Sequence, residues 1–138
     1  SLLSLSEQEM YSTIDMCMID VRKNYYDFIK LGATTGYIKH KSGEVEKVES
    51  NNLPVGVIED ICPHAVRKMI EPYDIIVMCS DGVSDVVSEG EMLEYLRLTD
   101  RVNPQDISDR IVHRALQNCG GVAHDDMTVV CIRLIENI

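Results

Sequence analysis

The 138-residue sequence predicts an α+β fold with mainly antiparallel sheets and two C-terminal helices packed on them. Short apolar runs separated by turn residues come first, two helical patterns follow, and one apolar run comes last. Strands and helices that are segregated along the chain, rather than alternating, indicate α+β layers. The early connections are too short for the crossovers that parallel pairs require, so neighbouring strands are expected to be antiparallel.

The early strands are expected to form one antiparallel meander. Residues 11–21 predict a strand with two partly apolar faces, both of them covered. Residues 27–32 and 36–40 predict two short strands, and residues 44–49 a weaker one. Met10, Met16, Met18, Met78 and Met92 are interpreted as core residues, Asp15 and Asp20 as hydrogen-bonded edge residues, and Glu44, Glu46 and Glu49 as a solvated face.

The middle of the chain predicts a loop and two further strands. Residues 51–56 contain Pro54 and Gly56 and are expected to form the loop. Residues 65–71 predict one strand and residues 74–80 the other. The second is a near-continuous apolar run, which is typical of a central strand buried on both faces.

Two helices and a final strand are predicted after this pair. Ser88 and Glu91 have the spacing of a capping box, so the first helix is expected to begin there. Asn103 followed by Pro104 predicts the start of the second helix, and Gly120-Gly121 predicts its end. Residues 127–135 predict the last strand.

The composition excludes some kinds of partner. The net charge is −10, from 23 acidic and 13 basic residues, so nucleic acid and anionic membrane surfaces are poor partners. No apolar run approaches the roughly 18 residues of a membrane span. The five cysteines are odd in number and form no C-x-x-C pair, and no signal peptide is apparent, which together indicate a reducing cytoplasm.

The first candidate for chemistry is the segment Ser80-Asp81-Gly82, at the end of the central strand. The strand holds the Asp81 carboxylate rigidly, and Gly82 has no side chain that would block a ligand. This arrangement suits a metal ligand or a phosphoacceptor. The alternative interpretation is an ordinary turn, because Asp-Gly pairs are common in turns.

The second candidate is His124-Asp125-Asp126, directly before the last strand. The alternative is an exposed loop, and a lone loop histidine such as His124 is more often solvated than metal-bound. If the two strands are antiparallel neighbours, Asp81 and Asp125 lie at the same sheet edge. Two such charges near 4 Å repel by about 4 kcal/mol at an effective dielectric of 20, and a divalent cation reverses that penalty. Oxygen-only ligands favour Mg²⁺ or Mn²⁺.

These two motifs resemble the C-terminal signatures of the protein phosphatase 2C superfamily. Asp81-Gly82-x-x-Asp85 and the run from Asp125 to Val130 carry the resemblance. The sporulation branch, stage II sporulation protein E, is the most similar. Further similar segments are Leu3-Ser4-Leu5, Tyr11-Ser12-Thr13-Ile14-Asp15, Phe28-Ile29-Lys30-Leu31-Gly32, Asn52-Leu53-Pro54-Val55-Gly56 and Asn103-Pro104-Gln105.

The resemblance implies an αββα sandwich with two Mn²⁺ or Mg²⁺ ions at one edge of its sheets. It implies that Asp81 and Asp125 are ligands of one ion, and that a metal-activated water, not a side chain, attacks the phosphorus. Asp126 stands where many relatives have Asn and is a weaker candidate for the outer part of the site. Gly82 and Asp85 are weaker candidates too, Asp85 as a supporting or turn residue.

The resemblance also implies partners and a cellular setting. The family substrate is a phosphoserine anti-anti-sigma factor, whose dephosphorylation activates a sporulation sigma factor. Full-length relatives are tethered to the membrane through a separate N-terminal region, with this part in the cytoplasm.

One departure from the family pattern concerns the other metal ligands. The family takes them from an N-terminal segment with Gly-Asp and Asp-Gly signatures, but this sequence has no Gly-Asp, and its only Asp-Gly is Asp81-Gly82. Residues 1–138 are therefore expected to be the C-terminal portion of one phosphatase domain, inactive alone, with an uncovered apolar surface that favours a homodimer. The alternatives are a non-catalytic binding or dimerisation module and a receiver-like sheet with Asp81 as phosphoacceptor.

Overall fold

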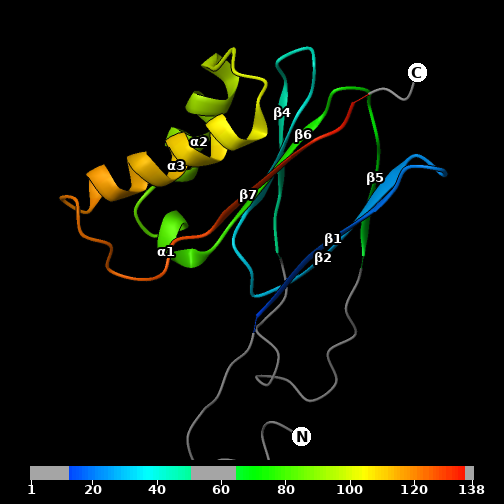
Figure 1. Cartoon of the computed structure of the whole chain (residues 1–138). Helices are drawn as coiled ribbons and strands as arrows, with labels where there is room; N and C mark the ends of the chain where they lie inside the picture. Colours follow the sequence, from blue (N-terminus) through cyan, green and yellow to red (C-terminus); the bar gives the residue numbers. More distant parts are fainter. Residues whose placement is uncertain (1–12, 51–64, 136–138) are drawn as a thin grey trace, which may run out of the picture. The chain divides into compact units, whose positions relative to one another are not determined.

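The computed structural model describes residues 13–50 and 65–135, which fall into two compact units (Figure 1). Strands β1, β2 and β5 belong to the first unit, and all other strands and the helices belong to the second. The predicted loop at residues 51–56, Met10, Cys62 and the similar segment around Leu3 lie outside the described residues.

The first unit is a three-stranded antiparallel sheet in the order β1-β2-β5. Strand β1 spans Ile14–Asp20, β2 spans Tyr25–Leu31 and β5 spans Val66–Met69. Asp20 closes the hairpin turn between β1 and β2, because its Oδ1 accepts hydrogen bonds from the backbone N–H groups of Arg22 and Lys23. Tyr26 and Phe28 are almost inaccessible, with their ring centroids 5.9 Å apart, and anchor this sheet.

The expectation that residues 11–21 form a strand covered on both sides is wrong for its methionines. Met16 and Met18 are each 52% exposed, so they are not core residues. Apolar composition shows only that a side chain tolerates burial, whereas burial also needs a covering element, which the strand itself does not encode. Asp15, in contrast, accepts a hydrogen bond from the buried Lys30 ammonium at 2.6 Å, as expected of a hydrogen-bonded edge residue.

The second unit contains a four-stranded sheet in the order β4-β3-β6-β7, with every pair antiparallel. Strand β3 spans Gly36–Lys39, β4 Val45–Val48, β6 Ile75–Cys79 and β7 Val129–Arg133. Strand β6 is an inner strand, and Ile75, Ile76, Val77 and Cys79 are all buried. The predicted central strand with two buried faces is therefore confirmed.

A single meander is not what the early strands form. The β1–β2 and β3–β4 hairpins are present, but β2 and β3 belong to different sheets. Strand β5 pairs with β2 and not with β6, across a long sequence separation. Short connections permit pairing of neighbours without requiring it, and the chain leaves the first sheet at Gly32, whose φ is +59°.

Helices α2 and α3 start where the sequence predicts, and α3 also ends at the predicted glycines. In α2 (Glu89–Leu98), the Ser88 Oγ accepts a hydrogen bond from the Glu91 N–H at 3.1 Å. In α3 (Pro104–Asn118), the Asn103 Oδ1 accepts one from the Gln105 N–H at 2.9 Å. Gly120 and Gly121 have φ of +69° and +91°, and the Gly121 N–H closes the helix end on the Leu116 carbonyl at 2.8 Å.

The helices cover one face of the four-stranded sheet (Figure 1). The shared core contains Tyr37, Ile75, Val77, Cys79, Val83, Val87, Met92, Leu96, Ile107, Ile111 and Ala115. Burying one such large aliphatic side chain stabilises a fold by about 1.5–3 kcal/mol. Because this core contains residues of β6 and packs against Val129 and Cys131 of β7, it holds these two strands in place. Among the described helices, none has both the length and the apolar character needed to cross a bilayer.

Candidate metal centre

The two acidic motifs meet at one edge of the second sheet, because β6 and β7 are antiparallel neighbours. Cys79 at the end of β6 faces Val129 at the start of β7. Ser80 extends the pairing: its N–H donates to the Thr128 carbonyl at 2.9 Å, and its Oγ accepts from the Thr128 N–H at 2.9 Å. The same Oγ donates to the Asp126 carbonyl at 3.2 Å, so Ser80 ties the two motifs together.

Asp81 begins a short helix rather than the turn that the sequence suggested. Helix α1 spans Asp81–Ser84, with Ser80 as its extended N-terminal cap. The Asp81 carboxylate is exposed, and a carboxylate in the first turn of a helix is favourably placed in the backbone dipole field. The Asp85 N–H donates to the Asp81 carbonyl at 2.8 Å, and the Asp85 side chain is exposed.

Gly82 is the point of closest approach between the motifs. It is buried, and a Cβ at this position would lie 2.1 Å from the Asp126 carbonyl oxygen and 2.9 Å from its carbon. No side chain can be accommodated against a backbone at that distance. The glycine is therefore required for packing between backbone segments, in addition to leaving the edge open.

The residues at this edge fit a hard divalent cation in donor type. Asp81, Asp125 and Asp126 are exposed, and none of them forms an ion pair with a cationic side chain among the described residues. Asp125 Oδ1 accepts the Asp126 N–H at 2.8 Å, which orients that carboxylate. Among the described residues, these three carboxylates are not close enough together to form a complete metal site. They would therefore supply only part of the ligand set. His124 is exposed, as a solvated loop histidine is expected to be.

A second polar cluster, which sequence reasoning missed, lies at the opposite end of β6. His40 is 7% exposed, and its Nδ1 lies 2.7 Å from Asp74 Oδ1 and 3.0 Å from Glu71 Oε2. Its Nε2 lies 3.1 Å from Glu46 Oε1, so Glu46 is not part of a solvated face. Burial lowers the pKa of His40, but its hydrogen bonds with Asp74 and Glu46 and the nearby charges raise that pKa more, to above its ordinary value of 6.5.

This cluster is a network of three carboxylates around the His40 imidazole. Ligand atoms of His40, Glu71 and Asp74 lie within 4.8 Å of one another, a spacing that a metal ion could bridge. However, both ring nitrogens already face carboxylates, which favours an imidazolium that donates on both sides over a neutral ligand. Asp74 is fully buried and also accepts the Glu71 N–H at 2.9 Å through Oδ2, so the network fixes the turn before β6.

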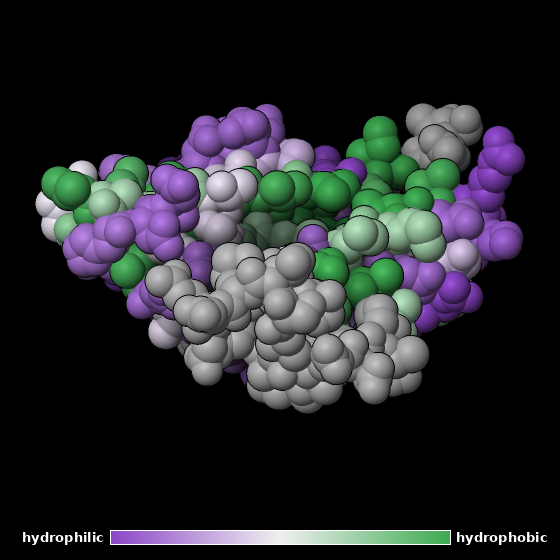
Figure 2. Space-filling view, turned by 90° about the horizontal axis from the view of Figure 1, so that it is seen from below, coloured by the Kyte–Doolittle hydropathy of each residue, from purple (hydrophilic) through white to green (hydrophobic). Residues whose placement is uncertain are grey.

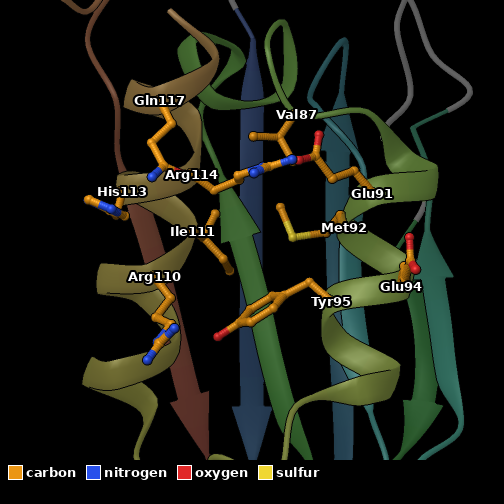
Figure 3. Close-up of a pocket in the computed structure, with 10 residues that line it drawn as sticks. All are labelled: Val87, Glu91, Met92, Glu94, Tyr95, Arg110, Ile111, His113, Arg114 and Gln117. Carbon is orange, nitrogen blue, oxygen red and sulfur yellow. The ribbon is translucent and has the colours of Figure 1, made fainter. Parts of the chain in front are cut away.

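A groove of about 360 Å³ separates helices α2 and α3 (Figure 3). Met92 and Ile111 lie in its floor beside the Tyr95 ring. Arg114 reaches across the groove to pair with Glu91, which joins the two helices (Figure 3). None of the acidic residues of the β6–β7 edge lines this groove.

Comparisons with known proteins show that this chain is similar to protein phosphatases in both sequence and fold. The chain is 31% identical over 80 residues to protein phosphatase 2C homolog 4 of Schizosaccharomyces pombe, covering 58% of this chain and 20% of that protein. It matches the solved phosphatase domain of the cell fate determinant SpoIIE from Bacillus subtilis, described as Mn presoaked, with a TM-score of 0.80 and 31% identity. That match covers 99% of this chain and 63% of that one. The fold is that of the PP2C-type serine/threonine phosphatases, and the predicted α+β class is confirmed.

The particular family follows from the sequence match. Residues 1–135 match the family model of stage II sporulation protein E (SpoIIE). Stage II sporulation protein E of Priestia megaterium is 34% identical over 146 residues, covering 99% of this chain. The chain belongs to the stage II sporulation protein E family. It spans 24% of the length of that relative.

Proposed function

We propose that this chain contributes the C-terminal part of a metal-dependent protein serine phosphatase domain. Its substrate would be a phosphoserine anti-anti-sigma factor, whose dephosphorylation activates a sporulation sigma factor in the cytoplasm. Family membership supports the reaction class. The observation that carries the proposal is the contact of Gly82 with the Asp125–Asp126 backbone, which holds two acidic motifs at one sheet edge.

In this proposal Asp81 and Asp125 are ligands of one Mn²⁺ or Mg²⁺ ion. Bound divalent ions lower the pKa of a coordinated water and neutralise charge on phosphoryl oxygens. The chain's own contribution is positional: the β6–β7 pairing fixes both acids, and Ser80 and Gly82 lock the two segments together. Asp126 and Asp85 would support the ligands without binding the ion directly.

The rest of the ligand set would come from a segment with Gly-Asp signatures. No Gly-Asp pair occurs in these 138 residues, and one carboxylate pair cannot hold two ions. We therefore expect negligible turnover from this chain alone. In the complete protein, a separate N-terminal region would tether the domain to the membrane.

The test is a Mn²⁺-dependent phosphatase assay on this chain and on one extended N-terminally, each with Asp81→Asn. We expect activity only in the extended chain, and a loss of roughly 100-fold or more with Asp81→Asn. Glu94→Gln removes the same charge from exposed α2 and serves as the matched control. Activity of the short chain would contradict the need for further ligands, and full activity of the extended Asp81→Asn form would contradict the ligand assignment.

A second candidate function is a non-catalytic binding or dimerisation module. The observation that favours it is the exposure of large apolar side chains on the first sheet, namely Met16, Met18, Val66 and Met69. An extended chain with no phosphatase activity but with stable self-association would support this second function.

A further inference from the structure

A cavity of about 470 Å³ in the second unit has five permanent cations among its thirteen lining residues. Its five permanent cationic side chains come from the end of β3, the β3–β4 turn, the last turn of α2, the α2–α3 connection and β7. They are Lys39, Lys41, Arg97, Arg101 and Arg133. They make up five of the 13 lysine and arginine residues of a chain whose net charge is −10. Asp100 is the only carboxylate in this lining, so the cavity is a local positive site on an acidic protein.

Arg133 carries an unsatisfied donor in this cavity. Its Nε is buried and has no acceptor among the described residues. Its guanidinium carbon lies 5.5 Å from the centroid of the Tyr73 ring, and Lys41 Nζ lies 4.9 Å from the same centroid. This Nε is inaccessible, so a ligand in the cavity would meet the outer guanidinium N–H groups of Arg133, which are charged donors suited to oxyanion oxygens.

The backbone at Tyr73 holds this arrangement under strain. Tyr73 has a φ of +67°, a left-handed conformation that bulky residues rarely adopt. The neighbouring Asp74 is fully buried against His40, which fixes the turn in that conformation. Strained residues of this kind cluster at ligand sites, and here the strain places an aromatic ring between two cations.

The other cations of the cavity differ in whether they already contact an acceptor within the protein. Lys39 Nζ donates to the Thr99 carbonyl at 2.6 Å, and Arg101 is 3.6 Å from Asp106. Arg97 is exposed at the last turn of α2 and has no acidic partner within the described residues. The carboxylates of Glu46, Glu71 and Asp74 contact the His40 ring and do not line the cavity. Lys41, Arg97 and Arg133 are therefore the cations most available to a ligand, and the two arginines are the ones with planar donor groups.

We propose that this cavity binds an oxyanion of the phosphate class, either free phosphate or the phosphate group of a small molecule. Planar guanidinium groups match the geometry of phosphate oxygens, and a cavity of this volume lies within the range of small-molecule sites. The site is separate from the metal centre. Arg133 faces Ile75 at one end of β6, and Val129 faces Cys79 at the other, about 13 Å away along the strand.

The test is a titration of the 138-residue chain with inorganic phosphate and, separately, with adenosine monophosphate. It is done free of divalent metal, with chloride holding the ionic strength constant, and followed by calorimetry and by backbone amide shifts. We expect saturable binding, with shifts concentrated at residues 39–43, 73 and 97–102. If adenosine monophosphate binds more tightly than inorganic phosphate, the ligand is the phosphate group of a small molecule. If the two Kd values are equal, the ligand is free phosphate.

Single substitutions separate this site from general charge effects. Arg133→Gln and Arg97→Gln are each expected to weaken the phosphate Kd by roughly tenfold. Arg110→Gln removes the same charge from the exposed face of α3, outside the cavity, and is expected to leave the Kd unchanged. Arg97 is exposed, so its variant stays informative if Arg133→Gln fails to fold. No saturable binding, or equal weakening by all three substitutions, would overturn the proposal.

Discussion

At the scale of single residues, Gly82 illustrates how closely the two acidic segments pack. A methyl group there would overlap the Asp126 carbonyl oxygen at 2.1 Å, and both neighbours are backbone groups that cannot rotate away. We expect Gly82→Ala to lower the free energy of unfolding by about 1–3 kcal/mol, because overpacking shifts backbone segments. Urea unfolding followed by circular dichroism measures this change.

Gly90→Ala is the matched control for that experiment. Gly90 lies in α2, where the nearest atom to an added Cβ is the Ser88 Oγ at 4.0 Å. The same substitution is therefore expected to stabilise the protein, by up to about 1 kcal/mol, through helix propensity. If both alanine variants were equally stable, the close approach at Gly82 would be refuted.

His40 gives a prediction about pH. Its pKa in the folded protein is raised above 6.5 by Asp74, Glu46 and Glu71, despite the opposing effect of burial. A raised folded pKa means that the stability from His40 is fully present below about pH 6.5 and is lost as pH rises through the folded pKa. The difference in unfolding free energy between the wild type and His40→Gln should therefore shrink as the pH rises above about 6.5.

An exposed histidine provides the comparison for that pH series. His113 lies on the exposed face of α3, and His113→Gln is the comparison variant. A difference for His40→Gln that stays constant across the series would mean that His40 is not held as an imidazolium.

The sequence predicts the candidate ligands Asp81 and Asp125 better than it predicts long-range contacts between side chains. Asp81 and Asp125 could be singled out because each flanks an apolar strand, a local pattern. The His40–Asp74 pair joins residues 34 apart in sequence, and Lys39 meets the Thr99 carbonyl across 60 residues. Such partners depend on how strands are arranged in three dimensions, which local patterns do not contain.

At the scale of elements, the helix caps carry a measurable part of the stability. Asn103 accepts the Gln105 N–H at the start of α3, and Asn103→Ala removes that acceptor. We expect a loss of about 1 kcal/mol in the free energy of unfolding, whereas Asn103→Asp, which keeps an oxygen there, should retain most of it. Equal losses in the two variants, measured by urea unfolding, would show that the cap bond does not stabilise α3.

The elements themselves were largely predictable, but their pairing was not. Capping residues and glycines mark α2 and α3 locally, and the apolar run marks β6 as buried. The division of the strands between two sheets could not be predicted, because apolar alternation is the same for a strand in either sheet. Helix α1 was missed because an Asp-Gly pair favours a turn as readily as a helix start.

At the scale of the whole molecule, exposed apolar side chains predict self-association. Hydrophobic residues reach the surface among hydrophilic ones on the face shown in Figure 2. Met16 and Met18 are each 52% exposed and Met69 is 65% exposed. We expect this chain to form dimers or to exchange strands, because apolar side chains exposed to water favour contact between copies.

Sedimentation velocity over a concentration series measures that association. The double substitution Met16→Lys with Met18→Lys is expected to shift the population towards monomer. Leu98→Lys introduces a charge at an apolar residue of α2 that is 76% exposed, and serves as the control. A monodisperse monomer of the unmodified chain at every concentration would contradict the prediction.

The most direct test of the account measures Mn²⁺ binding by the N-terminally extended chain, using calorimetry and the electron paramagnetic resonance of free Mn²⁺. The central claim is that Asp81 and Asp125 hold one divalent ion at the β6–β7 edge. We expect Asp81→Asn and Asp125→Asn each to weaken Mn²⁺ affinity by roughly 100-fold, and Glu94→Gln to leave it unchanged. Unaltered Mn²⁺ affinity in both aspartate variants would contradict it.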